Sequence, residues 1–103
     1  MTPLIEAAER AGATYRQANT WVMAGYLEAS YVNARNGKPS EGGSGSVCVL
    51  SEEEANVLGV VARLVKVGFL PGKAAPLSRE LVRQGWADLG GGIHLTMRME
   101  RET

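Results

Sequence analysis

The sequence has few of the residue types that build disulfide scaffolds, zinc sites or catalytic centres. It contains one cysteine, Cys48, and one histidine, His94. A single cysteine forms no internal disulfide and makes no zinc site by itself, and its apolar neighbours indicate a buried structural thiol. His94 lies between Ile93 and Leu95 in an expected strand, without a serine, cysteine or aspartate constellation around it, so we interpret it as surface-facing. These features predict a protein that is not an enzyme and that uses no cofactor or metal.

Long apolar runs and an excess of charge of one sign are also missing. No run approaches the roughly 18 apolar residues that span a bilayer, and Glu6 and Glu9 stand where a secretion signal carries basic residues. We therefore expect a cytoplasmic protein that does not enter a membrane. Eleven basic and eleven acidic residues cancel, which counts against a strongly electrostatic nucleic-acid binder but leaves local patches open. With 103 residues, of which 45% are hydrophobic, the chain is expected to form one domain over residues 1–103.

Two short helices are predicted at the N-terminal end of the chain. The first has a cap at Thr2, proline at its first helical position and a stop at Gly12. Its apolar repeat consists of Leu4, Ile5, Ala8 and Ala11. The second begins with a capping box formed by Thr14 and Gln17 and stops at Gly25. Its expected inward face consists of Tyr15, Ala18, Trp21 and Val22.

The middle of the chain predicts a hairpin followed by a helix. An irregular strand from Tyr26 to Val32 and the strand VCVL flank the polar segment NARNGKPSEGGSGS, which we interpret as a long flexible tip. Because GGSGS leads into a strand and no Gly-Lys-Ser/Thr follows it, a phosphate-binding loop is rejected. A third helix opens with a capping box of Ser51 and Glu54 and ends at Gly68. Its acidic first turn favours the helix dipole, and its apolar stripe consists of Val57, Leu58, Val61, Leu64 and Val65.

A fourth helix and a second hairpin complete the chain. The helix is predicted from Ala75 to Gln84, with a stop at Gly85 and with Leu77, Leu81 and Val82 facing inward. The runs WADL, GGG and IHLTM then predict two strands about a glycine turn, with Trp86 packed against the helices. Since a hairpin is marginal alone, we expect it mainly to complete the core and secondarily to offer a weak self-association surface.

Small residues in the first two predicted helices have the spacing of a helix-turn-helix unit. Ala8, Gly12 and Ala18 stand where such a unit needs a small residue, a turn glycine and a modest apolar residue. This arrangement turns four hydrogen-bonding side chains outward: Arg16, Gln17, Asn19 and Thr20. Such side chains reach guanine, adenine and phosphate from the major groove. A solvated helix face is the alternative, and the capping role of Gln17 competes with base reading.

The hairpin that follows a helix-turn-helix unit is a wing. Arg35 and Lys38 in its tip are placed to contact the phosphate backbone or the adjacent minor groove. The runs TYRQANTWVMAGYLEAS, GGSGS and LSEEEANVLGVVARLVKVGF resemble the winged-helix DNA-binding domain of the MerR family, in the version common in actinobacteria and their phages. The resemblance covers about residues 3–84. Its motif residues here are Thr14, Tyr15, Arg16, Gln17, Trp21, Gly25 and Leu27.

The resemblance implies a mainly α fold with a small β part, an α+β winged helix-turn-helix with about four helices. Its expected parts are a helix-turn-helix (1–25), a β-hairpin wing (26–50) and helices three and four (51–84). The C-terminal β-hairpin (86–97) is expected from its own sequence pattern and lies outside the resemblance. Double-stranded DNA is the implied partner. The residues of this chain that are expected to contact the DNA are Thr14, Tyr15, Arg16, Gln17, Asn19, Thr20, Arg35 and Lys38.

The chain departs from the family pattern at several places. Many members carry arginine and an aromatic residue where this chain has Asn19 and Thr20, and arginines where it has Val47, Cys48 and Val49. The long coiled-coil helix and effector domain of full-length regulators are missing, so a small-molecule or metal sensor is not expected.

We therefore expect a small sequence-specific DNA-binding protein, a transcriptional regulator. Two alternatives stay open. An excisionase-like recombination directionality factor shares the winged architecture and also lacks sensor domains. A protein-interaction module on the same scaffold is favoured by the neutral charge and the missing wing arginines. Because one DNA-binding module buries only about 600 to 1,000 Å², weak homo-oligomers or side-by-side assembly on DNA are expected.

Overall fold

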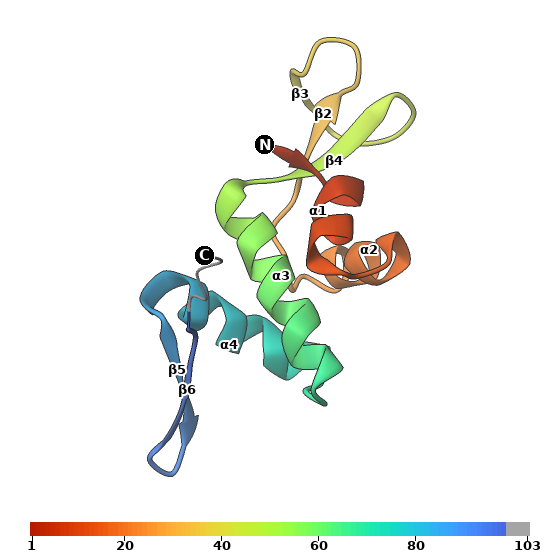
Figure 1. The fold of residues 1–103 in the computed structure, drawn as a ribbon. Coiled ribbons are helices and arrows are strands. Elements are labelled where there is room, and N and C mark those ends of the chain that lie inside the picture. The colour runs from red at the N-terminus through yellow and green to blue at the C-terminus, as the bar shows by residue number, and fades with distance from the viewer. Residues whose placement is uncertain (99–103) are drawn as a thin grey trace, which may run out of the picture.

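The computed structural model describes residues 1–98 and shows an α+β fold (Figure 1). Within these residues four helices form the body, and six strands form two small antiparallel sheets. The larger sheet and the C-terminal hairpin lie at opposite ends of the molecule, with the helices between them (Figure 1). The predicted α+β class, with four helices and two small β units, is therefore confirmed.

The larger sheet has four strands in the order β1-β4-β2-β3. These strands are β1 (Thr2–Pro3), β2 (Ser30–Asn33), β3 (Pro39–Ser40) and β4 (Ser46–Leu50). The predicted pairing of two strands within residues 26–50 is confirmed by β2 and β4, although β2 begins later than the predicted Tyr26. The prediction of one long flexible tip is wrong. Strand β3 pairs with β2, placing Ser40 opposite Tyr31, and divides the segment into two separate turns.

Helices α1 (Leu4–Ala11) and α2 (Tyr15–Met23) are joined by the predicted short turn at Gly12. Gly12 has a φ of 73°, a left-handed conformation that glycine adopts without strain. Ala8 and Ala18 are both buried in the core, as the helix-turn-helix spacing requires. The two helices therefore pack with the small residues between them that the sequence indicates.

The start of α1 differs from the prediction in two ways. Thr2 does not cap the helix, because it lies in β1 opposite Leu50, and Pro3 occupies the N-cap position without a side-chain hydrogen bond. Ile5, predicted to face inward, is exposed, and Ala7 is buried instead. Pairing with β4 thus fixes the entry into α1, and the helix is rotated relative to the predicted apolar repeat.

Helices α3 (Glu52–Lys66) and α4 (Pro71–Gln84) complete the body. The stripe predicted on α3 is confirmed in the core, where Val57, Leu58 and Val61 are fully buried. Helix α4 begins at Pro71, four residues earlier than the predicted Ala75, because proline suits the first helical turn, where its missing amide is not needed. None of the helices within residues 1–98 has the length and apolar character needed to cross a membrane.

Strands β5 (Trp86–Gly90) and β6 (Ile93–Thr96) form the predicted C-terminal hairpin. Only its base packs on the helices, through the buried Ala87 and the half-buried Leu95. Trp86 is 43% exposed and stacks on the exposed His94, with 5.0 Å between ring centroids. The prediction that Trp86 is buried is wrong, because strand alternation turns Ala87 inward in its place. The surface position predicted for His94 is confirmed.

Candidate nucleic-acid interface

The first turn of α2 is held by reciprocal hydrogen bonds. Thr14 Oγ1 accepts from the Gln17 amide at 3.0 Å, and Gln17 Oε1 accepts from the Thr14 amide at 3.0 Å. The predicted capping box is therefore confirmed. Both side chains serve the backbone of the helix, which leaves the Gln17 side-chain nitrogen as its remaining hydrogen-bonding group. Thr14 and Gln17 thus fix the orientation of α2.

The outer side of α2 carries the remaining predicted residues of this helix. Arg16 and Thr20 are exposed and lie one helical turn apart, so they occupy one stripe. Asn19 is half-buried at its edge. Tyr15, predicted on the inward face, is in fact exposed, whereas Trp21 lies in the core. The outward stripe is therefore polar with one cation, Arg16.

A shallow groove joins the beginning of α2 to the larger sheet. Tyr15 lines it from α2, and Ser46 to Cys48 line it from β4, with residues 3–5 completing its walls. The N-terminal end of α2 and strand β4 therefore share one surface.

Arg35 and Lys38 lie in the turn between β2 and β3, which its own side chains hold in shape. Asn33 Oδ1 accepts from the Arg35 amide at 2.8 Å, and Asn36 Oδ1 accepts from the Lys38 amide at 2.9 Å. Gly37, with a φ of 69°, completes the turn. Both cations are exposed, so the turn presents two positive charges on an ordered backbone.

The β2–β3 turn lies beside the start of β4. The Ala34 amide donates to the Gly45 carbonyl at 2.8 Å, and Asn33 lies opposite Ser46, which also lines the groove with Tyr15. Strand β4 therefore links the turn to α2, and both lie on the side of the molecule away from the C-terminal hairpin (Figure 1). Arg16, Arg35 and Lys38 form no hydrogen-bonded cluster with one another in residues 1–98.

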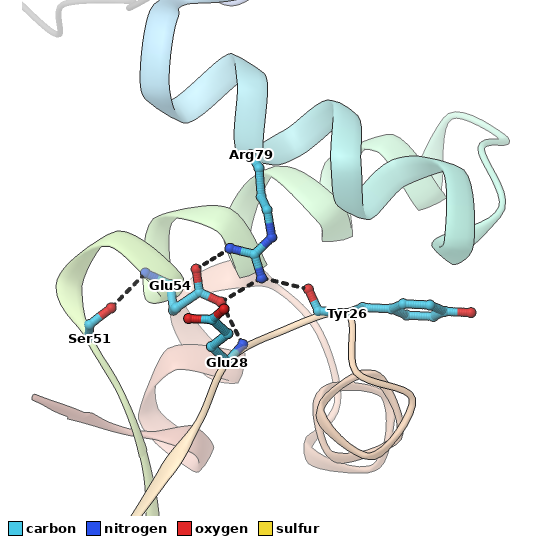
Figure 2. Close-up of polar contacts among 5 residues, drawn as sticks. All are labelled: Tyr26, Glu28, Ser51, Glu54 and Arg79. Carbon is cyan, nitrogen blue, oxygen red and sulfur yellow. Dashed lines mark hydrogen bonds and ion pairs between the residues drawn. The ribbon is translucent and has the colours of Figure 1, made fainter.

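A polar cluster that was not predicted lies elsewhere, between α3, α4 and the segment that links α2 to β2. Arg79 of α4 donates to both carboxylate oxygens of Glu54, at 2.5 and 2.8 Å, and to the Tyr26 carbonyl at 3.0 Å (Figure 2). Glu54 Oε1 also accepts from the Glu28 amide at 2.6 Å. Figure 2 shows the guanidinium reaching down from α4 onto the start of α3 and the segment that links α2 to β2. The cluster therefore fastens that segment to both long helices.

The electrostatics of this cluster indicate a structural role. Burial alone would raise the pKa of the Glu54 carboxyl, but the hydrogen bonds from Arg79 and Glu28 and the charge of Arg79 outweigh burial, so this pKa is lowered. The hydrogen bond to Glu54 raises the pKa of Arg79. Both groups therefore stay ionised at neutral pH, which suits a fixed ion pair better than a group that exchanges protons.

The cluster also changes the predicted start of α3. Ser51 Oγ accepts from the Glu54 amide at 3.1 Å, as predicted, but the Glu54 carboxylate turns to Arg79 and does not return to Ser51. For the second predicted capping box, the serine cap is therefore confirmed and the return bond from the Glu54 side chain is wrong. A sequence signal existed, because Glu54 precedes Val57 and Leu58 by three and four residues and so lies in the same inward stripe.

The chemistry of the remaining side chains is limited. Within residues 1–98 no group of three or more histidine, cysteine, aspartate or glutamate side chains is arranged to hold a metal. Burial raises the pKa of the half-buried Cys48 thiol, against a smaller opposite effect from Tyr31, so the thiol stays protonated at neutral pH. Comparisons of the chain with protein-family models, with curated proteins and with solved structures find no match.

Proposed function

We propose that this protein is a small sequence-specific DNA-binding protein of the winged helix-turn-helix type and that it acts as a transcriptional regulator. In this proposal α2 is the recognition helix, and strands β2 to β4 with their turns are the wing. The observation that supports it best is the shared surface of α2 and β4. This surface supports the proposal because it connects the start of α2 to β4, the strand beside the basic β2–β3 turn.

Each candidate residue has a role that follows from its position. Arg16 is the exposed cation of α2 and is suited to a bidentate contact with guanine. Thr20 lies in the same stripe and Asn19 at its edge, and both supply further polar contacts. The exposed Tyr15 side chain at the helix start is placed for a phosphate, while Thr14 and Gln17 hold the helix in register.

The wing role rests on charge and geometry at the β2–β3 turn. Arg35 and Lys38 are exposed on a backbone ordered by Asn33 and Asn36, so their contacts with phosphate require little additional ordering. With three cations on this side and no net charge on the chain, one copy is expected to bind DNA with modest affinity.

The proposal is tested by fluorescence anisotropy with a random-sequence duplex at low and moderate salt, followed by selection of bound sequences from a random pool. We expect binding that weakens steeply with salt and a short recovered motif. Arg83→Ala is the matched control, since it removes one exposed cation from α4, away from α2 and the β2–β3 turn. Absence of binding at low salt would refute the proposal.

A second candidate is a protein-interaction module, favoured by one apolar side chain on the same surface. Met23 at the end of α2 is 75% exposed, and a large apolar side chain in that position suits a protein partner better than phosphate. The salt titration separates the two functions, because only the DNA-binding protein responds to a bare duplex.

A further inference from the structure

The C-terminal hairpin projects beyond the helices (Figure 1), and apolar side chains on it are exposed. Ile93 in β6 is 61% exposed, and Met97 just after it is 40% exposed. Leu95 lies between them on the same face of the strand, because side chains alternate along a strand and Leu95 pairs with the inward Ala87. One face of β6 is thus entirely apolar, and its outer part is uncovered.

Hydrogen bonds show which backbone groups of the hairpin remain free. The Met97 amide donates to the Gly85 carbonyl at 2.8 Å, which makes these two residues a hydrogen-bonded position of the hairpin, while the Gly85 amide donates to the Leu81 carbonyl of α4. Because bonded and non-bonded pairs alternate in an antiparallel ladder, Leu95 also bonds across it, while His94 and Thr96 direct their amides and carbonyls away from β5.

The two edges of the hairpin differ. On the β5 edge, Gln84 Nε2 donates to the Trp86 carbonyl at 3.0 Å, and the Asp88 amide donates to Glu80 Oε2 at 3.4 Å. Side chains of α4 therefore occupy that edge. On the β6 edge, the outward groups of His94 and Thr96 have no partner in residues 1–98. The sequence of β6, IHLT, also lacks the lysine, acidic residue or proline that usually protects an open edge.

We propose that β6 pairs antiparallel with β6 of a second copy of this chain, about a two-fold axis at Leu95. In this register His94 of each copy bonds with Thr96 of the other, which satisfies all of the free backbone groups. Leu95 lies opposite Leu95 of the partner, and Ile93 lies opposite the partner's Met97. The strand is thus complementary to itself, with an unbroken apolar ladder and no like charges in opposition.

In the same geometry, the second copy covers the outer part of β6 that is exposed in the monomer. Antiparallel pairing places the tip of each hairpin beside the base of the other. Since the two-fold axis is perpendicular to the joined sheet, the apolar faces of both hairpins lie on the same face of that sheet. Ile93, which extends beyond its own helices, then lies next to the base of the partner's hairpin and its helices. This association does not depend on the proposed DNA-binding function.

Sedimentation of the full chain from micromolar to near-millimolar concentration tests the association. We expect a monomer–dimer equilibrium that Thr96→Pro and Ile93→Lys each weaken at least about tenfold. Proline at position 96 removes an outward amide without breaking the bonds to β5, and Ile93 is too exposed to support the monomer core. Val67→Lys, which changes an even more exposed apolar residue at the end of α3, should have no effect. A monomer at every concentration, or a dimer insensitive to both β6 variants, would overturn the proposal.

Disulfide trapping tests the register. In a Cys48→Ser background, Leu95→Cys should oxidise to a covalent dimer, because non-bonded antiparallel partners have Cα atoms about 4.5 Å apart, within disulfide range. Ile93→Cys is the control. It is the more exposed position but lies opposite Met97 of the partner, so it should cross-link slowly. Faster cross-linking at position 93 than at 95 would contradict the two-fold register.

Discussion

At the scale of single residues, two buried polar side chains of the core have opposite energetic consequences. Glu54 accepts hydrogen bonds from Arg79 and from the Glu28 amide, so its desolvation is compensated. Ser78 of α4 is 0% exposed, and its hydroxyl has no partner within residues 1–98. The first side chain should stabilise the fold, and the second should weaken it.

Replacement of Ser78 by alanine should therefore stabilise the protein. Ser78→Ala removes an uncompensated buried hydroxyl and improves helix propensity, so we expect the free energy of unfolding to rise by about 0.5 to 1 kcal/mol. Urea denaturation measures this change. Ser51→Ala is the matched comparison, because it removes a serine that caps α3 and should destabilise by about 1 kcal/mol. A loss of stability in both variants would show that the Ser78 hydroxyl has a favourable contact.

Glu54 should make the free energy of unfolding depend on pH in the acidic range. Its pKa is lowered in the folded protein, so its contribution is complete above the ordinary pKa of a glutamate and is lost as the pH falls through the folded value. Glu54→Gln should lower the free energy of unfolding at neutral pH by about 2 kcal/mol and flatten its decline in acid. Denaturation curves from neutral pH to pH about 3 measure both effects.

Glu53→Gln is the control for this prediction. Glu53 is exposed in the same helical turn, and its replacement removes the same charge while leaving the hydrogen bonds between Arg79 and Glu54 in place. If Glu53→Gln and Glu54→Gln had equal effects, the ion pair would contribute nothing beyond its charge.

Arg16 tests base reading by α2. Arg16→Ala should weaken binding to the selected sequence by about 1 to 3 kcal/mol and relax the preference at one base position. Competition against duplexes changed at single positions measures this. An equal loss on all sequences would make Arg16 a phosphate contact.

At the scale of elements, the two cations of the β2–β3 turn should contribute to DNA binding together, through their charge. Removing the charges of Arg35 and Lys38 together should lower DNA affinity nearly uniformly across sequences and flatten the salt dependence by roughly 1 to 2 units. Anisotropy titrations over a salt series measure the slope. Because β3 separates this turn from the glycine-serine loop, shortening that loop should leave the slope unchanged. An unaltered slope in the charge variant would exclude the turn from the interface.

The elements that sequence predicts well are those fixed by local chemistry. The Thr14 and Gln17 cap, the turn at Gly12 and the apolar stripe through Val57 and Leu58 all depend on neighbours within one or two helical turns. Most predicted interface residues are exposed for the same reason, since the phase of α2 determines which side chains face outward.

Features fixed by distant parts of the chain were missed. Thr2 pairs with β4, which lies more than 40 residues away, so its capping pattern is not used. Glu54 meets an arginine that is 25 residues distant. Trp86 was predicted to be buried because it is a large aromatic residue, but the register of β5 turns the smaller Ala87 toward α4. Propensity and periodicity carry no information about these pairings.

At the scale of the whole molecule, the side proposed to bind DNA and the C-terminal hairpin lie far apart (Figure 1). If two copies join through β6, their α2 helices lie at opposite ends of the pair. A dimer of this kind should hold two separate duplexes or two distant sites on one duplex. We expect energy transfer between differently labelled duplexes in the presence of the wild-type protein.

Thr96→Pro supplies the control, because it should bind one duplex normally without bringing two together. Transfer that persists in this variant would show that the bridge forms elsewhere.

The β2–β3 turn also contains a site of slow chemical modification. Asn36 precedes Gly37, and an asparagine before glycine is prone to deamidation. The glycine nitrogen, which no side chain shields, attacks the side-chain carbonyl carbon of the asparagine and releases ammonia, and water then opens the cyclic imide. The product is an aspartate or isoaspartate between Arg35 and Lys38, which adds a negative charge to the surface proposed to meet phosphate. Aged protein, identified by mass spectrometry, should therefore bind DNA more weakly than fresh protein, with its helices and core unchanged.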